Sequence, residues 1–353
     1  MNAVGIGLVG AGRIGATYAQ ILASTAGIRF AGLTDACPER AEAVGARHGA
    51  PVLPSLDALL DLEAVEAVIV CTPPDSHAGL CLQVVAGGRH VLCEKPVARS
   101  TDEALAMLTA ARRAGVLFTM GAKYRFVPDV RLAAEMLASG RFGRPVLVEN
   151  TFAGRVDMRG RWNADPARSG GGVLIDNGTH SVDLLRLLIG PVREVLALAP
   201  PRVQDLEVED TVRLLARCGD GTLGVVDLSW SLDPSDASYL VVHAERGLVR
   251  LAWDGARYRT VGDADWVHFG DGYDKVACIR AQVRNFAAAI RGTEPLLVAA
   301  EDALASVAVI DAAYRSLASG TWTPVAELVA LDGAAGPTRD AGAQRPPVGE
   351  ATG

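Results

Sequence analysis

The sequence predicts an α/β protein in which a parallel sheet is followed by a second, mostly antiparallel sheet. The first 120 residues alternate between short β-branched runs and helical patterns, which is typical of a parallel sheet with helices on both faces. From Val192 to about Phe269, strand-like runs follow one another with turn signals between them, as in an antiparallel sheet. A chain of 353 residues is also too long for a single hydrophobic core of ordinary size. We therefore expect domains at residues 1–122 and 123–330, and a disordered Gly-, Ala- and Pro-rich tail at 331–353.

The elements of the first part have clear start and stop residues. Pro38 and Ser100 stand where helices are expected to begin, and Gly88 and Gly115 stand where they are expected to end. The expected strands are residues 4–10, 28–35, 66–72, 89–95 and 115–122. The expected helices are residues 13–24, 38–48, 75–88 and 100–115.

The second part has a different rhythm. A helix is expected over residues 128–140 and a strand over 144–154, before a glycine-rich stretch that leads into a helix near His180. Further strands are expected at 210–218, 222–231, 239–245 and 247–253, and further helices at 278–292 and 300–320. Val226, Leu228 and Trp230 indicate an apolar sheet face that would need a partner surface, so we expect a homo-oligomer, a dimer or tetramer.

Bulk composition excludes several classes of protein. The net charge of −7 gives no general attraction to nucleic acid or to an anionic membrane. No apolar run approaches the roughly 18 residues that a membrane helix needs, and the N-terminus has no basic segment typical of a signal peptide. The six cysteines are scattered without CxxC or His-Cys spacing, which indicates reduced cysteines in the cytoplasm and no metal site.

The stretch GLVGAGRIGATYAQIL carries a dinucleotide signal. Gly10, Gly12 and Gly15 follow a strand and open a helix. Gly10 permits a tight turn, Gly12 lets the backbone approach a pyrophosphate, and Gly15 lets helix and strand pack closely. The phosphates would bind at the helix N-terminus, beside Arg13 and Ile14. The alternative is a tight turn without a ligand, as in any doubly wound protein.

Asp35 ends the second strand, where an acid can hydrogen-bond the adenosine ribose and repel a 2′-phosphate. We therefore expect NAD rather than NADP as cofactor. Arg40 tempers this expectation, because an arginine nearby can accommodate that phosphate. A cap on the helix that begins at Pro38 is the alternative role of Asp35.

Further cofactor contacts are expected where ligands bind in open α/β sheets, at the carboxyl ends of the strands. CTPPDSH places Thr72, Pro73 and Pro74 there, with His77 close behind, and Glu94 ends a later strand. The alternative for this segment is a proline-rich helix start capped by Asp75.

Three motifs together resemble one family. GAGRIG, EKP at residues 94–96 and GGGVLIDNGTH at 170–180 occur in the order seen in the Gfo/Idh/MocA oxidoreductases, the family of glucose–fructose oxidoreductase and inositol dehydrogenase. The likeness spans about residues 4 to 325. It implies a Rossmann domain followed by an α+β domain with an open, mostly antiparallel sheet, and a substrate bound between them. It also implies that Lys95 is the catalytic lysine, that Asp176 and His180 are the acid–histidine pair, and that Asp35 binds the ribose.

The chemistry of these residues fits alcohol oxidation. A neutral His180 near a helix N-terminus is suited to take the hydroxyl proton as hydride leaves carbon for the nicotinamide. Lys95 can hydrogen-bond the reacting oxygen, and Asp176, about one helical turn before His180, can balance the charge of either. The run Gly170–Gly172 is expected to let the backbone approach a ligand closely. Alternatively, Asp176 and Asn177 cap the helix and His180 fills its first turn.

The substrate is expected to be a cyclitol, such as an inositol or an amino-cyclitol, or a free sugar. The loops bordering the expected cleft supply many hydrogen-bonding groups: Lys123, Tyr124, Arg161, Asn163 and Asn177. If Lys123, Arg155 and Arg161 instead bind a phosphate, the substrate is a nucleotide-linked or phosphorylated sugar. A sensor that binds the dinucleotide without turnover is a further alternative, and the retention of all three catalytic candidates favours the enzyme.

Overall fold

The computed structural model describes residues 3–326, so the expected tail at 331–353 lies outside the described residues. Five strands form a parallel sheet in the order β2-β1-β3-β4-β5. They are β1 (Val4–Val9), β2 (Ile28–Thr34), β3 (Ala67–Val70), β4 (His90–Cys93) and β5 (Phe118–Met120). Every residue of β1 and β3 is buried, because helices cover both faces of the sheet.

The helices of this half begin and end at residues that favour helix ends. They are α1 (Arg13–Ser24), α2 (Pro38–His48), α3 (Leu56–Leu60), the 3₁₀ turn η1 (Pro74–Ser76), α4 (His77–Ala86) and α5 (Thr101–Ala114). The Ser100 hydroxyl accepts a hydrogen bond from Glu103 N at the start of α5, and Gly115 ends that helix in the left-handed conformation. The sequence did not predict α3, a single turn that the Ser55 hydroxyl caps.

A second sheet of nine strands follows in the order β13-β12-β11-β10-β6-β9-β8-β7-β14. Its strands are β6 (Pro145–Ala153), β7 (Val192–Leu198), β8 (Thr211–Cys218), β9 (Leu223–Ser229), β10 (Ser238–Ala244), β11 (Gly247–Ala252), β12 (Gly255–Thr260), β13 (Val267–Phe269) and β14 (Thr323–Pro324). Only β6 and β9 pair in parallel among these strands. The predicted fold class, a parallel sheet followed by a mostly antiparallel one, is confirmed.

Helices cover one face of the nine-stranded sheet, where α9 and α8 contact β9 and α11 contacts β7. The helical elements of this half are η2 (Lys123–Phe126), α6 (Pro128–Ala138), η3 (Trp162–Ala164), α7 (Pro166–Ser169), α8 (Val173–Asp176), α9 (Gly178–Ile189), α10 (Lys275–Ile290) and α11 (Ala300–Ser319). Val226, Leu228 and Trp230 lie under these helices and are 0, 1 and 4% exposed in the single chain. The expectation that these three residues await a partner surface is therefore wrong.

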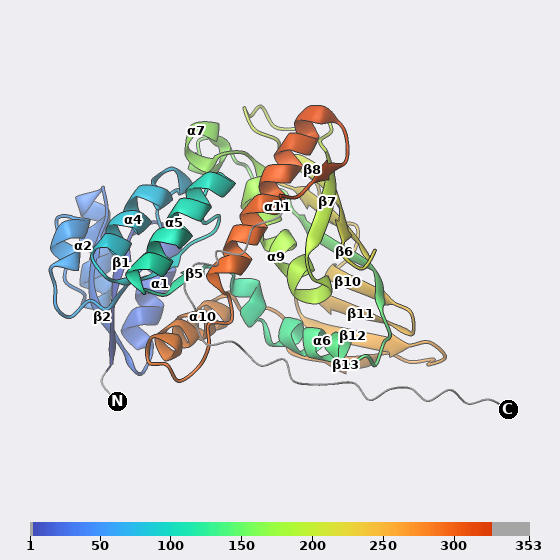
Figure 1. The fold of residues 1–353 in the computed structure, drawn as a ribbon, viewed down its shortest axis with the longest axis horizontal. Coiled ribbons are helices and arrows are strands. Elements are labelled where there is room, and N and C mark those ends of the chain that lie inside the picture. The colour runs from blue at the N-terminus through green and yellow to red at the C-terminus, as the bar shows by residue number, and fades with distance from the viewer. Residues whose placement is uncertain (1–2, 327–353) are drawn as a thin grey trace.

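Two late helices join the halves. The α10 side chains Ile279, Val283 and Phe286 share one buried cluster with Tyr18 and Leu22 of α1. A distant part of the chain thus completes the hydrophobic core on one side of the first sheet. Helix α11 contacts both α5 and α9, and it runs between the two sheets in Figure 1. The carboxyl ends of the parallel strands are thus held against the second half.

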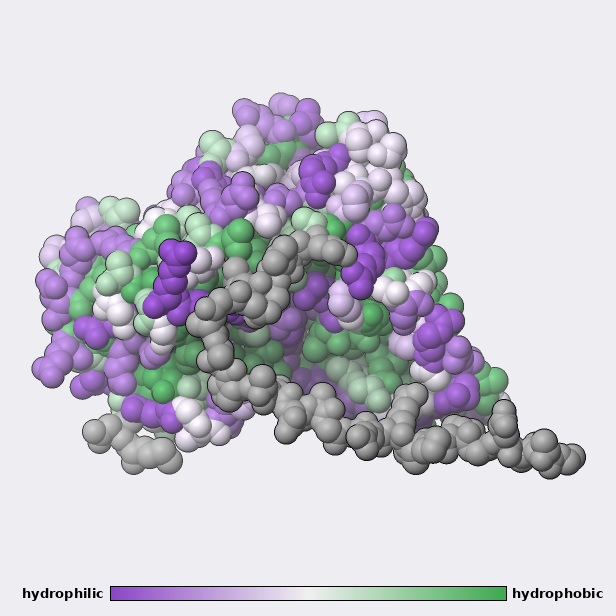
Figure 2. Space-filling model, viewed as in Figure 1, coloured by the Kyte–Doolittle hydropathy of each residue, from purple (hydrophilic) through white to green (hydrophobic). Residues whose placement is uncertain are grey.

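The surface carries both polar and apolar residues. In Figure 2, hydrophilic residues predominate along the outer edges of both halves, and hydrophobic residues gather toward the middle of this face. Among residues 3–326, no helix is long and apolar enough to cross a membrane.

Candidate active site

The glycine-rich loop lies between β1 and α1. Gly10 has a φ of +97°, which favours glycine, and a Cβ on it would lie 2.8 Å from the Cys71 carbonyl. A Cβ on Gly15 would lie only 2.0 Å from the Gly10 oxygen. Gly12, the N-cap of α1, has nothing within 4 Å of its Cβ position. The loop therefore offers bare backbone and a helix N-terminus, which fits a pyrophosphate, with Arg13 exposed and Ile14 half-buried beside it.

The Asp35 carboxylate lies against this loop. Its Oδ2 accepts a hydrogen bond of 2.6 Å from Ala11 N, and its Oδ1 accepts one of 2.8 Å from Cys37 N. Arg40, largely exposed, approaches Oδ1 at 3.8 Å. Asp35 and Arg40 thus lie side by side next to the glycine-rich loop.

The segment after β3 has a buried anchor. His77 is 0% exposed, and its Nδ1 and Nε2 lie 2.9 Å from Pro96 O and 2.8 Å from Thr72 O. Burial lowers its pKa, although the two carbonyls oppose that shift. Thr72 and Pro73 remain partly exposed, whereas Pro74 is buried. Direct contact of His77 with a cofactor does not fit this position, and the ring instead ties the loop after β3 to the loop after β4.

Lys95 joins the two halves. Its Nζ lies 2.5 Å from Oδ1 of Asp176 and donates a 3.0 Å hydrogen bond to the Asp176 carbonyl. Both side chains are less than one-fifth exposed. The neighbouring Glu94 points back into the first half, where it accepts a 2.8 Å hydrogen bond from the Tyr18 hydroxyl. The EKP segment thus delivers a lysine to the acid of the second half while its glutamate supports α1.

His180 and Lys123 form the next contact. Lys123 Nζ lies 3.4 Å from His180 Nε2, and the rings of Tyr124 and His180 pack edge to face with 4.9 Å between their centroids. Burial lowers the pKa of His180 well below its usual 6.5, and the charges of Lys123 and Lys95 add to that shift. Burial also lowers the pKa of Lys123 to about 8, again with help from Lys95. The imidazole is therefore neutral at pH 7.

The glycine run is built for packing within the protein. A Cβ on Gly171 would lie 1.9 Å from the Tyr314 hydroxyl, and one on Gly172 would lie 2.0 Å from the Glu209 carbonyl. The Glu209 carboxylate accepts hydrogen bonds from Gly172 N, Leu174 N and the Tyr314 hydroxyl. The expectation that these glycines approach a ligand is thus wrong for Gly171 and Gly172, which instead anchor the start of α8 and so fix Asp176.

The alternative of a simple helix cap does not fit either side chain. Asn177 stands between α8 and α9 but makes no side-chain cap hydrogen bond, and the Asp176 carboxylate is engaged by Lys95. His180 lies in the first turn of α9 with its ring against Lys123 and Tyr124. The local helix therefore needs neither polar side chain for its own capping.

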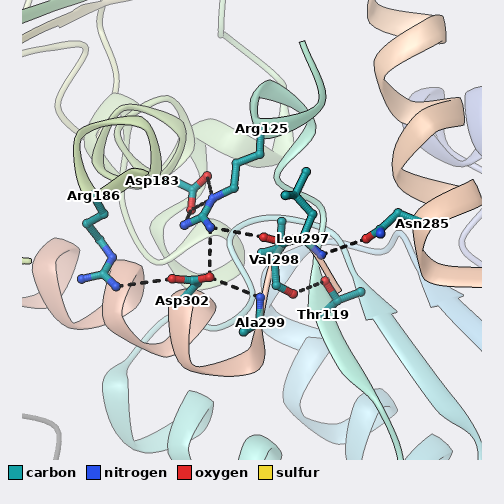
Figure 3. Close-up of polar contacts among 9 residues, drawn as sticks. All are labelled: Thr119, Arg125, Asp183, Arg186, Asn285, Leu297, Val298, Ala299 and Asp302. Atoms are coloured by element: carbon teal, nitrogen blue, oxygen red, sulfur yellow. Dashed lines mark hydrogen bonds and ion pairs between the residues drawn. The ribbon is translucent and has the colours of Figure 1, made fainter. Parts of the chain in front are cut away.

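A buried ionic network holds η2 against α9 (Figure 3). Arg125 donates hydrogen bonds to both oxygens of Asp183 at 2.9 and 3.0 Å, and its Nη1 donates to Asp302 at the start of α11. Arg186 approaches the same Asp302 at 3.6 Å. Because Arg125 is two residues from Lys123 and Asp183 three residues from His180, the network fixes the elements that carry both groups.

The remaining expected substrate residues are spread more widely. Tyr124 is buried, and Asn177 is partly exposed beside Asp176. Arg161 is exposed and Asn163 half-buried near η3, and within residues 3–326 neither bonds to Lys95, Asp176 or His180. The structure therefore brings the three catalytic candidates, Lys123, Tyr124 and Asn177 to one region, and it does not join Arg161 and Asn163 to them.

The sequence did not predict a group of packed aromatic side chains beside His180, which we call the aromatic wall. Tyr124 stacks on Phe152 and Tyr273 at 5.0 and 5.1 Å, and Trp253, 45% exposed, packs on Tyr273 and Tyr239. These five residues come from five separate segments, so no local pattern marks them. In a chain with 5% aromatic residues, this wall beside His180 offers apolar surface for the face of a ring.

Lys275, at the first position of α10, was also missed. It lies close enough to Arg13, Glu94 and Lys95 for their charges to act on its pKa, which burial lowers first of all. Among the described residues no group of histidine, cysteine, aspartate or glutamate is arranged to hold a metal ion.

Comparison with known proteins places this chain in a family. Residues 4–122 match the oxidoreductase family with an NAD-binding Rossmann fold, and residues 130–250 match the GFO/IDH/MocA C-terminal domain. Inositol 2-dehydrogenase of Rhizobium meliloti (strain 1021) is 27% identical over 89% of this chain and 97% of its own length.

Two further relatives cover most of both chains. D-xylose 1-dehydrogenase (NADP(+)) 2 of Haloferax volcanii is 30% identical over 80% of this chain and 87% of its own. The solved structure of GenD2 from gentamicin A biosynthesis in complex with NAD is 28% identical, with a TM-score of 0.82, and covers 93% of this chain and 97% of its own. The chain therefore belongs to the Gfo/Idh/MocA family of oxidoreductases, and its N-terminal part is an NAD-binding Rossmann domain.

Proposed function

We propose that this protein is an NAD-dependent dehydrogenase that oxidises a secondary hydroxyl of a cyclitol or sugar. The observation that carries the proposal is the ion pair between Lys95 and Asp176, which joins the two halves close to a neutral His180. A sensor without turnover has no chemical need for these three groups together. Bound NAD would supply the acceptor for the hydride that leaves the carbinol carbon.

The residues divide the remaining work. Lys95, held in place by its ion pair with Asp176, donates a hydrogen bond to the reacting oxygen and stabilises its alkoxide character. His180 accepts the hydroxyl proton at its imidazole, which is neutral because burial and two nearby lysines oppose its protonation. Asp176 thus acts on the oxygen through Lys95. Gly12 and the N-terminus of α1 hold the pyrophosphate, while Gly10 and Gly15 let the loop turn and pack closely enough to present them.

Asp35 supports NAD as the preferred cofactor. Its carboxylate is fixed by Ala11 N and Cys37 N, so it cannot easily turn away from an incoming 2′-phosphate. Arg40 lies on the exposed side of Asp35 and is the residue through which some use of NADP would arise.

A cyclitol such as an inositol or amino-cyclitol is the first candidate substrate. Lys123 and Asn177 offer hydrogen bonds to ring hydroxyls, Arg161 and Asn163 offer more from the η3 segment, and the relatives include an inositol dehydrogenase. A nucleotide-linked or phosphorylated sugar is the second candidate. It is less favoured because Arg155 is already paired with Asp233 at 2.8 Å.

The test is a substrate panel with purified protein and NAD. The absorbance of NADH gives kcat/KM for myo-inositol, scyllo-inositol, free hexoses and a nucleotide-linked hexose. We expect turnover of a free cyclitol or hexose. Turnover of the nucleotide-linked sugar alone contradicts the cyclitol assignment, and NAD binding without turnover of any member indicates a sensor.

We also propose that the protein is a cytoplasmic homo-oligomer, a dimer or tetramer. All six cysteines are free, and Leu198 and Leu223 of the nine-stranded sheet are 48 and 43% exposed. Light scattering after gel filtration gives the mass in solution, and a monomer at micromolar concentration contradicts the proposal.

A further inference from the structure

Lysine is almost absent from this chain. Of its 34 lysine and arginine residues, only three are lysines: Lys95, Lys123 and Lys275. All three gather at the candidate site, because Lys123 lies close enough to the other two for their charges to act on its pKa. Elsewhere the chain uses arginine for every basic side chain. Lysine is therefore kept where arginine would not serve.

Arginine and lysine differ in one property that matters here. Arginine forms the better bidentate partner for carboxylates and phosphates, but its guanidinium does not lose a proton in proteins. Lysine is a point charge that gives up its proton readily when it is buried. A site that only bound an anion would be expected to use arginine in this chain, so the presence of lysine indicates proton transfer.

The contacts of Lys123 fit this role. Its Nζ lies 3.4 Å from His180 Nε2 and 5.2 Å from the centroid of the Tyr124 ring, the next residue in the chain. Within residues 3–326 no carboxylate lies within ion-pairing distance of Nζ, in contrast to Lys95 with Asp176. The ammonium form is thus not fixed by a partner, and the neutral amine is accessible.

Exposure gives the direction of transfer. His180 is 7% exposed, and Lys123 is its one side-chain hydrogen-bond partner among the described residues. Lys123 itself is partly exposed. Lys123 therefore offers a proton on His180 a route toward solvent.

We propose that Lys123 is the second proton carrier of the reaction, receiving at Nζ the proton that His180 removes from the substrate. The inference rests on the proposed function. As the O–H bond breaks, its electron pair forms the C=O bond, and the carbon-bound hydrogen leaves with its pair as hydride to the oxidised nicotinamide. The proton passes to the imidazole of His180, whose Nε2 then gives a proton to neutral Lys123; the ammonium formed there releases its proton to water or buffer.

The pH dependence follows from the groups around Lys123. Lys95 and Glu94 face it from the loop after β4, Asp176 and His180 from α8 and α9, and Lys275 from α10. Burial is the first cause of its lowered pKa of about 8. Because oxidation needs the neutral amine, kcat should rise with pH through this value and level off above it.

Two variants separate proton transfer from charge. Lys123→Arg keeps the cation but cannot release a proton, so we expect kcat at pH 9 to fall at least about tenfold and the rise near pH 8 to disappear. Lys123→Met removes both the positive charge and the proton-carrying group. Added methylamine should restore activity in proportion to its free-base concentration. Tetramethylammonium, which carries no proton, should not. Arg144→Gln serves as the matched control. Arg144 precedes β6 and pairs with Glu245, and its replacement should leave the pH profile of kcat as in wild type.

A direct measurement is also possible because there are only three lysines. Carbon-13 labelling of lysine should give three resonances, assigned with Lys123→Arg, of which the Lys123 signal should titrate near pH 8. A Lys123→Arg enzyme with the wild-type kcat profile, or no rescue of Lys123→Met by methylamine, overturns the inference while wild-type turnover upholds the proposed function. Wild-type protein that oxidises no member of the panel overturns both.

Discussion

Gly12 and Gly15 lie three residues apart around the start of α1, yet a methyl group added to each should have a different effect. Gly12 caps α1 and has nothing within 4 Å of its Cβ position. A Cβ on Gly15 would lie 2.0 Å from the Gly10 carbonyl oxygen, where ordinary contact begins at 3.4 Å. Gly12→Ala therefore tests the binding of the cofactor, and Gly15→Ala tests the packing of the loop.

The magnitudes follow from these distances. Gly12→Ala should change the free energy of unfolding by less than about 1 kcal/mol, since the methyl group meets no protein atom. It should cost at least one charge-assisted hydrogen bond to the pyrophosphate, about 1.5–3 kcal/mol. That loss corresponds to a roughly 10- to 100-fold higher Kd for NAD.

Gly15→Ala must move backbone by about 1.4 Å to reach ordinary contact, the difference between 3.4 and 2.0 Å. Overpacking of this kind costs about 3 kcal/mol, which lowers Tm by roughly 5 °C in a chain of this size. Calorimetry gives Tm for both variants, and quenching of tryptophan fluorescence gives their Kd for NAD. A Gly12→Ala protein that binds NAD within twofold of wild type would refute the assignment of Gly12 to the pyrophosphate.

Three other perturbations test the rest of the site. Asp35→Ser should lower the ratio of kcat/KM for NAD over NADP at least about tenfold, and equal use of both cofactors by the wild type contradicts the role of Asp35. Lys95→Ala and His180→Ala should each lower kcat about 100-fold or more with little change in NAD affinity, and normal turnover by His180→Ala at neutral pH removes it from the mechanism. Arg125→Met should lower the free energy of unfolding by about 3–5 kcal/mol, because it leaves Asp183 buried without its partner. Urea titration should show that the double variant Arg125→Met/Asp183→Leu recovers much of this loss. An Arg125→Met protein as stable as wild type contradicts the role of the network.

Local patterns predicted the elements well where end residues were explicit. Helices α1 and α2 run over residues 13–24 and 38–48, as the sequence predicts, because Gly12, Pro38 and Gly49 mark their ends. The missed turn α3 is too short to show a hydrophobic period, and only its cap at Ser55 marks it.

The site was predictable only in part, because motifs name residues without giving their partners. The structure pairs Lys95 with Asp176 and brings Lys95 close enough to His180 for its charge to act on the imidazole pKa, while the catalytic roles of the three stay a prediction. Glu209, by contrast, anchors α8 from a segment more than thirty residues away, and no periodicity relates the two. His77 stands in a segment typical of ligand binding, but its burial depends on two carbonyls that only the folded chain brings together.

Lys275 shows a signal of another kind. Neither its position nor its neighbours stand out locally, and only the count of lysines in the whole chain does. Composition is therefore informative about individual residues when one of two similar side chains is nearly absent.

The sharing of one core by α1 and α10 has a consequence for synthesis. When a ribosome has joined Ala122, all five strands of the first sheet exist, but the side chains that cover Tyr18 and Leu22 have not been made. They come only with Ile279, Val283 and Phe286, after strands β6 to β13 of the second sheet have been made. The nascent nucleotide-binding half must therefore wait with an exposed apolar groove, and a fragment that ends at Ala122 should depend on chaperones or aggregate.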